Sequence, residues 1–498
     1  MSSVGGRQLA LTDAVDEALV RAERVRDAEL ELEYWIADSE NKRELFVPRV
    51  DVGADYRFGT NPALSPMYAF LWQYESITSH AGNGRVGFGG LSPWGTDYSV
   101  TGAVSMDLTD ERGVPLSPHY RVPVSVSLSQ PILRGFGEVN LAPLQVARAQ
   151  RDQSDARIAV AKQLTRIEVA IRYIELQLAQ EIITVRTESL ALANDSLRAT
   201  EEMVQLGRAP ASSLRSQEVT ARIRAHELAV ARSDLQAFRA RLASAMNVAD
   251  IDITALGQLP GPGSLPEPAA LPELTRQHSP ALAAARQRLS LVNIGVTTSR
   301  NALLPDLRLA FEAASIGEAG QPQCKNGFFI DGVTPCAIPP GMEGGIDRAL
   351  VNVAQPRWGY LSGGLQFSIA LDYGPLVAAL TKAEATLARE TLMVDSLETR
   401  SVAEATASLN ALGFLLSQRD EAITVIRAAE AALALSREGF GAGRVSVLEL
   451  IAAQEQMARA KELELRARAS IAVEAVRLHA SAGTLEEFIK NPPPALGR

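Results

Sequence analysis

The sequence has few aromatic residues and no long apolar run. Only 5% of its 498 residues are Phe, Trp or Tyr, which is sparse for a compact globule of this size. No stretch of 18 or more consecutive apolar residues occurs, so the sequence predicts no transmembrane helix. The formal net charge of -9 argues against a nucleic-acid partner.

The beginning of the sequence lacks the apolar core of a signal peptide. Its first twenty residues include Asp13, Asp16 and Glu17 instead. We therefore expect no signal peptide in this sequence. An exported protein needs one, so any assignment outside the cytoplasm assumes that the segment has been removed.

Patterns typical of catalysis and metal binding are also missing. No nucleophile elbow, P-loop or dinucleotide fingerprint occurs. We expect no enzymatic activity, no cofactor and no metal, so that a partner must supply the energy for any process that requires it. The five histidines are scattered without metal spacing: His80, His119, His226, His278 and His479.

Only two cysteines are present, and Cys324 and Cys336 flank one Gly/Pro-rich segment. No histidine or second cysteine pair accompanies them, which argues against zinc. We expect a disulfide that closes a loop in an oxidising compartment. Two free thiols are the alternative.

Ala, Leu, Glu, Arg and Gln are abundant in long stretches, as in long helices and coiled coils. A helix is expected at 9–45. Neither Pro nor Gly occurs at 144–206, where apolar residues step by threes and fours as in a coiled-coil seam. Such a helix is about 95 Å long at 1.5 Å per residue. Gly207 and Pro210 end it, and a return helix is expected at 211–247.

Four segments alternate between apolar and polar residues and are predicted to be strands: 48–58, 121–130, 305–313 and 363–372. Each has the length that crosses a bilayer when tilted. Whether residues 85–108 add further β structure stays open. The polar faces, which would line a barrel lumen, carry Arg49, Asp51, Asp55, Arg57, Ser125, Ser127, Asp306, Arg308, Glu312 and Asp372. An ordinary solvated sheet face is the alternative.

The same plan occurs twice along the chain. The second copy is expected to contain a helix at 278–303, a long helix at 376–438 and a return helix at 446–482. The expected segments are a first repeat (1–255), a Pro/Gly-rich linker (256–275), a second repeat (276–482) and a C-terminal tail (483–498).

The apolar strand faces must meet either one another or lipid. A soluble sandwich buries them, a membrane barrel presents them to lipid, and pattern alone does not separate the two. The four predicted strands form two pairs, 48–58 with 121–130 and 305–313 with 363–372. Each pair has a long loop at one end and long helices at the other, which favours the barrel. Four strands do not close a barrel, and open edges do not survive in lipid, so several chains must share one. Two chains give eight strands, which side chains nearly fill, whereas three give twelve and room for a pore.

Three segments carry a family resemblance. SQPILRGFGEVNLAPLQVARAQ (129–150) is similar to a strand-to-helix junction, and MVQLGRAPASSLRSQE (203–218) and REGFGAGRVSVLELIAAQ (437–454) are similar to two helix-hairpin tips. With these motifs, essentially the whole chain resembles the TolC-like outer-membrane efflux family. The second tip is the better match, because the first is one residue shorter. The junction near 370–380 keeps only Gly374-Pro375.

The resemblance implies an α+β membrane protein with long antiparallel helical coiled-coil hairpins. It also implies a homotrimer whose twelve-stranded barrel lies in outer-membrane lipid and whose helical tunnel lies in the periplasm. Its partners would be a periplasmic membrane-fusion adaptor and an inner-membrane transporter. The expected function is an exit duct for small-molecule efflux or type I secretion, which the sequence does not separate. A soluble periplasmic coiled-coil protein with a β-sandwich head is the alternative.

The resemblance also assigns roles at the tips. Glu449 would form a periplasmic gate, because family members often carry an acidic residue there and three copies would favour cations. Alternatively, Ser446 and Glu449 form a capping box at a helix N-terminus. The expected adaptor-docking residues are Leu206, Gly207, Arg208, Phe440, Gly441, Gly443 and Arg444; alternatively they only form, pack or solvate the two turns.

Overall fold

The computed structural model describes residues 7–62, 76–111, 114–251, 253–256, 260–323, 338–355 and 357–494. The chain forms two compact units, and each takes segments from both halves of the sequence. Unit 1 comprises Met1–Trp35, Gln150–Ser290 and Arg389–Arg498. Unit 2 comprises Ile36–Ala149 and Leu291–Ala388.

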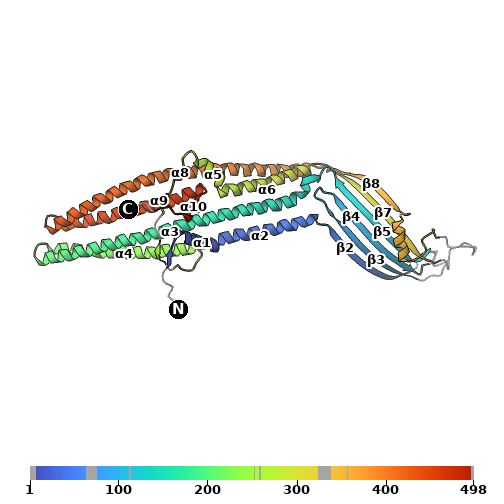
Figure 1. The fold of residues 1–498 in the computed structure, drawn as a ribbon, viewed down its shortest axis with the longest axis horizontal. Coiled ribbons are helices and arrows are strands. Elements are labelled where there is room, and N and C mark those ends of the chain that lie inside the picture. Colours follow the sequence, from blue (N-terminus) through green and yellow to red (C-terminus); the bar gives the residue numbers. More distant parts are fainter. Residues whose placement is uncertain are drawn as a thin grey trace, which may run out of the picture. The chain divides into compact units, whose positions relative to one another are not determined.

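Most of the chain is helical (Figure 1). The α-helices, in chain order, are α1 (Leu11–Arg21), α2 (Glu23–Arg43), α3 (Ala142–Gln205), α4 (Ala211–Ala245), α5 (Leu271–His278), α6 (Pro280–Ala302), α7 (Ile346–Ala354), α8 (Gly374–Gly441), α9 (Val447–Ser481) and α10 (Leu485–Lys490). The segments expected as two long helices and their returns are occupied by α3, α4, α8 and α9. Within the described ranges, none of the helices combines the length and the apolarity needed to cross a membrane.

Helix boundaries differ from the expectations at two places. The single helix expected at 9–45 is divided at Ala22, where the backbone is extended with φ -62° and ψ 120°. Inside the expected linker, α5 begins at Leu271 with a proline in its first turn, a position that needs no backbone donor.

The strands form two sheets (Figure 1). In unit 1, β1 (Arg7–Leu9) pairs in parallel with β6 (Ile253–Leu256), and neither strand was expected. In unit 2, one antiparallel sheet has the order β2-β3-β4-β5-β7-β8. Its strands are β2 (Arg49–Pro62), β3 (Ser76–Leu91), β4 (Asp97–Thr109), β5 (Leu116–Pro131), β7 (Asp306–Pro322) and β8 (Gly359–Ser368).

The expectation of four strands in this sheet is therefore wrong, because β3 and β4 bring the number to six. Glycines hide β3 in the sequence, since glycine is depleted in strands and costs backbone entropy there. Pairing with β2 on one side and β4 on the other supplies the ladder that stabilises it. The apolar–polar alternation of β4 was visible in the sequence.

The end of the sheet corrects a further expectation. Because β8 ends at Ser368, Asp372 does not belong to a strand. Its carboxylate instead accepts a hydrogen bond from the backbone amide of Gly374 at 2.8 Å, at the first residue of α8. Asp372 is thus a local cap and drops out of the set of lumen candidates.

Small residues let the helices of unit 1 pack closely. On α9, Ala472, Ala475 and Val476 are fully buried in a cluster with residues of α1, α3, α4 and α10. The buried Tyr173 of α3 donates a hydrogen bond to the carbonyl of Leu9 at 2.8 Å. This bond satisfies a buried phenol and ties β1 to the helices.

Candidate functional site

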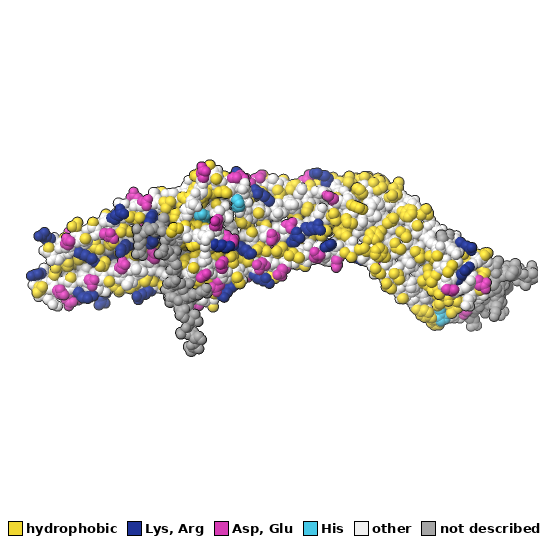
Figure 2. Space-filling view, viewed as in Figure 1, with side chains coloured by type: hydrophobic (Ala, Val, Ile, Leu, Met, Phe, Trp, Pro, Cys, Tyr) yellow, Lys and Arg dark blue, Asp and Glu magenta, His cyan; other side chains and the backbone are white. Residues whose placement is uncertain are grey.

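The sheet of unit 2 has one apolar face that is exposed. Val50, Val52, Tyr56 and Phe58 on β2 have exposed fractions between 60% and 76%. Figure 2 shows hydrophobic side chains gathered over this part of the molecule, whereas charged side chains are scattered over the helices of unit 1. An exposed apolar surface of this extent marks an interaction with lipid or protein.

The apolar face continues across all six strands. Residues that lie opposite one another in antiparallel strands share a face. One such row runs through Val50, Phe88, Val100, Val126, Ala313 and Leu361, each opposite the next. All six side chains are apolar, so the sequence alternation and the strand register agree.

The apolar band on this face is slanted relative to the rows. On β2 it runs from Val50 to Phe58, but on β7 it runs from Leu307 to Ala313, which lies in the row of Val50. From β2 to β7 the band centre shifts by about seven residues, or about 23 Å, over four strand spacings of about 4.8 Å. The ratio corresponds to a strand tilt of about 50°, close to the roughly 45° at which strands cross a bilayer. A horizontal apolar belt across tilted strands produces this slant.

A short helix covers part of the same face beyond the band. The backbone of Gly317 on β7 lies directly against Ala349 and Val353 of α7, where a Cβ atom would have no room. Asn352 of α7 donates a hydrogen bond to the carbonyl of Glu318 at 2.8 Å. The outer side of α7 is itself apolar and about half exposed at Ile346, Leu350 and Val351. The face therefore stays apolar where the helix covers it. Sequence reasoning missed this helix.

The opposite face of the sheet is polar, and it gathers the predicted lumen residues that lie in strands. They are Arg49, Asp51, Asp55, Arg57, Ser125, Ser127, Asp306, Arg308 and Glu312. The strands β3 and β4 add residues that sequence reasoning did not assign: Asn83, Arg85, Ser99, Thr101, Ser105 and Asp107.

Hydrogen bonds join neighbouring strands on this polar face. Asn83 donates to the carboxylate of Asp55 at 2.9 Å, and the hydroxyls of Ser99 and Ser127 lie 2.8 Å apart. The Tyr360 hydroxyl donates to the carboxylate of Glu312 at 2.5 Å. Charges of both signs occur on this face, so neither sign dominates.

In unit 1, each of the two tight helix reversals depends on one glycine. Gly207, between α3 and α4, has φ +67°, and Gly443, between α8 and α9, has φ +69°. Other residues rarely adopt this left-handed conformation. Gly441 is different, because it is the last residue of α8.

Among the other residues predicted at these tips, Leu206 is 67% exposed, and Arg208 and Arg444 are also exposed. Phe440 is only 7% exposed and packs in a cluster with Val447 of α9. The expectation that Phe440 contacts an adaptor is therefore corrected. It anchors the turn, because burying an aromatic ring there stabilises the hairpin.

Glu449 takes part in the capping box that the sequence allowed. Its backbone amide donates to the Ser446 hydroxyl at 3.2 Å, and its carboxylate accepts from the Ser446 amide at 3.1 Å. The side chain remains exposed. The box therefore holds one negative charge in a fixed place at the N-terminus of α9.

Partly buried ion pairs connect α3 with α9 in unit 1. Lys461 lies 2.7 Å from Glu188, and Arg186 lies 2.7 Å from Glu462. Arg468 contacts Glu181 by a further short contact. These pairs fix which residues of the two helices lie opposite each other.

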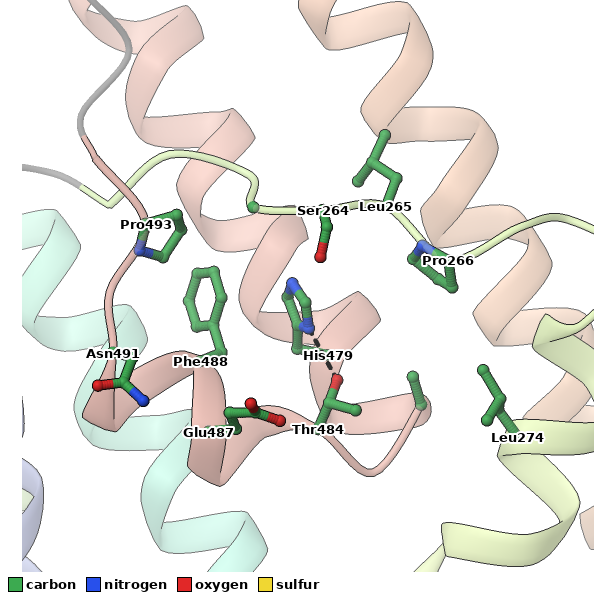
Figure 3. A pocket seen from close by; sticks show the side chains of 12 residues that line it. Ser264, Leu265, Pro266, Leu274, His479, Thr484, Glu487, Phe488, Asn491 and Pro493 are labelled. Atoms are coloured by element: carbon green, nitrogen blue, oxygen red, sulfur yellow. Dashed lines mark hydrogen bonds between the residues drawn. The ribbon is translucent and has the colours of Figure 1, made fainter.

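A pocket of unit 1 surrounds His479 at the end of α9 (Figure 3). Its Nε2 lies 3.3 Å from the carbonyl of Pro262, and its Nδ1 lies 2.8 Å from the Thr484 hydroxyl. Since a carbonyl only accepts, Nε2 carries the proton and Nδ1 accepts from Thr484. Phe488 stacks on the imidazole ring at 4.4 Å. Burial lowers the pKa of His479, against the opposing effects of the Pro262 carbonyl and the Glu487 carboxylate.

Cys324 and Cys336 lie outside the described residues, so their pairing stays a prediction. In the described portion of the chain, no group of three or more His, Cys, Asp or Glu side chains is arranged to hold a metal ion.

Part of the chain matches one family model, and the structure resembles several solved structures. Residues 271–484 match the family model described as outer membrane efflux protein. None of the curated proteins compared with the chain matches it.

Several solved structures share the fold. CusC has a TM-score of 0.65 at 14% identity, with 97% of this chain and 95% of CusC covered. VceC of Vibrio cholerae has a TM-score of 0.62 at 14% identity, covering 95% and 96%. The MtrE outer membrane channel of Neisseria gonorrhoeae has a TM-score of 0.63 at 18% identity, covering 95% and 89%. At these identities the likeness concerns the fold alone.

The capping box predicts a local stability effect. Ser446→Ala removes the side-chain acceptor and should destabilise the first turn of α9 by about 1 kcal/mol. Amide hydrogen exchange in that turn should become about fivefold faster in the folded protein. Ser212→Ala in the first turn of α4, whose N-cap is Pro210, is the matched control. Unchanged exchange in the Ser446 variant would contradict the capping role.

The His479 pocket predicts a dependence of stability on pH. Because the folded-state pKa is depressed, the unfolded chain binds the proton more readily. The stability that neutral His479 provides should be fully present above about pH 6.5 and decline as the pH falls further. The difference in Tm between the unmodified protein and His479→Gln should therefore shrink on acidification. His278→Gln, at an exposed position, is the control, and a difference independent of pH would refute the assignment.

Proposed function

We propose that the chain, whose residues 271–484 match the family model described as outer membrane efflux protein, is one subunit of an outer-membrane exit duct. In this proposal the six strands span the outer membrane and the helices form a periplasmic tunnel. The duct exports small molecules or, in a type I system, secreted protein. It performs no chemistry of its own, and an inner-membrane transporter supplies the energy.

The exposed, slanted apolar band is the observation that carries this proposal. Exposing side chains such as Val52 and Phe58 to water is unfavourable by roughly 25 cal/mol for every Å² of apolar surface. Lipid removes that cost, and strands tilted by about 45° are the form in which a sheet crosses a bilayer. The polar face then lines water.

The alternative of a soluble protein with a β-sandwich head has less support. A sandwich needs a second sheet packed on the apolar face. In the described part of unit 2 the strands form a single sheet, and α7 covers only the ends of β5 and β7. Most of the apolar face is left without a protein partner there.

The proposed assembly is a homotrimer that docks a periplasmic adaptor at the hairpin tips. Support for docking comes from exposed leucines at both reversals, since Leu206 is 67% and Leu448 is 69% exposed. Arg208 and Arg444 follow the two turn glycines and provide exposed charge beside them. Apolar contacts rimmed by cations suit a partner surface with apolar and acidic side chains.

Reconstitution tests the proposed function directly. The purified full chain should need detergent to stay in solution, and it should produce discrete conductance steps in a planar lipid bilayer. A sample that stays soluble and monodisperse without detergent and gives no conductance would reject the duct.

The gate assignment of Glu449 predicts ion selectivity. Glu449→Gln removes the charge but keeps an oxygen that accepts the Ser446 amide, so the capping box should survive. Three fewer negative charges at the tunnel mouth should lower the cation preference. The measurement is the reversal potential in asymmetric salt, with Glu404→Gln, in the middle of α8, as the control. An unchanged reversal potential would leave Glu449 with the capping role only.

A further inference from the structure

We propose that three copies of this chain close one eighteen-stranded barrel, in which β2 of each copy pairs with β8 of the next. The inference rests on the proposed function, which supplies the three copies and the lipid in which a sheet has to close. It replaces the twelve strands expected from the resemblance, since each chain contributes six. The pore wall is incomplete in any single copy.

The two edges of the sheet are open. In the described strands, β2 pairs only with β3, and β8 pairs only with β7. The 14 residues of β2 and the 10 residues of β8 therefore present backbone donors and acceptors without a strand partner. In hydrocarbon each such group costs several kcal/mol, which excludes an open edge.

The β8 edge is not protected against pairing. Natural sheets blunt exposed edges with charged side chains, proline or bulges. Strand β8, GYLSGGLQFS, contains no charged residue and no proline, and all ten of its residues are exposed. Its register with β7 is free of bulges. This edge has the properties of a strand that receives another strand.

The direction of the strands permits the junction. All neighbours in the sheet are antiparallel, and an even number of strands makes β2 and β8 run in opposite directions. Joining β8 of one copy to β2 of the next therefore continues the antiparallel order. It also keeps the apolar faces of both copies on the same side.

The slant of the apolar band fixes the register of the junction. Across one strand spacing the band shifts by about two residues, in the same direction from β2 to β8. The first band residue of β2, Val50, should therefore lie opposite Phe367 or Ile369, where the apolar band of β8 ends. Either register continues the apolar belt around the barrel without a step.

Eighteen strands change what the barrel admits. Barrel diameter grows roughly linearly with strand number, so this barrel is about half as wide again as a twelve-stranded one. Barrels of this size enclose an aqueous channel, and the polar face provides its wall. The outer segment of the duct should therefore admit solutes that a twelve-stranded barrel rejects.

Disulfide trapping between edges tests the junction. In the full chain with Cys324→Ser and Cys336→Ser, the pairs Val50→Cys/Phe367→Cys and Val50→Cys/Ile369→Cys are oxidised in membranes. Directly opposed side chains lie within disulfide range, so at least one pair should give covalent dimers and trimers on non-reducing gels. Val50→Cys/Leu309→Cys is the control, because Leu309 lies on the inner strand β7, and it should stay monomeric.

A second measurement reports the width. Ser127→Cys on the polar face, in the same cysteine-free background, is treated with polyethylene glycol maleimides of increasing size. A variant in which a short Gly-Ser linker replaces residues 63–111 lacks β3 and β4 and leaves twelve strands. The intact chain should accept larger polymers than this variant.

The possible outcomes distinguish a failure of the eighteen-stranded barrel from a failure of the proposed exit duct. Particle mass in detergent gives the number of copies, independently of the edge pairing. Three copies that cross-link at neither pair and show the same polymer limit as the shortened variant would overturn the eighteen-stranded barrel and leave the exit duct standing. A water-soluble monomer would overturn both.

Discussion

A backbone amide or carbonyl in hydrocarbon has no water to hydrogen-bond with, so leaving it unpaired costs several kcal/mol of free energy. This cost is the constraint from which the proposed arrangement of the sheet and its copies follows. The apolar face of unit 2 is exposed over six strands, so lipid is the medium that suits its side chains. The same medium forbids free strand edges. In the proposed exit duct, the apolar face therefore requires a membrane, and the open strand edges require further copies of the chain. The proposed assembly follows from the sheet before the helices are considered.

Local sequence pattern predicted those features that depend on local physics. The alternation around Val50 and Val126 indicated strands, because side-chain period and burial are set within one segment. Gly207 and Gly443 marked helix reversals, since few other residues adopt a positive φ. The capping box at Ser446 was one of two alternatives that the residues left open, and it is formed. Its role at a gate depends on neighbouring copies and is not contained in one chain.

What escaped prediction depends on partners distant in sequence. Glycines in β3 lower its intrinsic preference for a strand, and only the ladders with β2 and β4 outweigh that deficit. The burial of Phe440 depends on Val447 and other residues of α9 across the turn. In the sequence alone, Gly317 is an unfavourable strand residue. In the structure α7 packs directly against it, and this close approach requires a residue without a side chain. In each case, contacts with residues distant in sequence determine the structure, and the local sequence pattern does not contain them.

Capping and gating at Glu449 are not exclusive alternatives in physical terms. A gate needs a charge at a defined position, and the two hydrogen bonds with Ser446 hold the carboxylate in one orientation. The N-terminus of α9 carries a partial positive charge, which weakens the field that the carboxylate would project into the proposed tunnel. The capping box therefore fixes the charge and screens it at the same time. A ring of such residues should impose a mild preference for cations and leave passage open to neutral and anionic cargo.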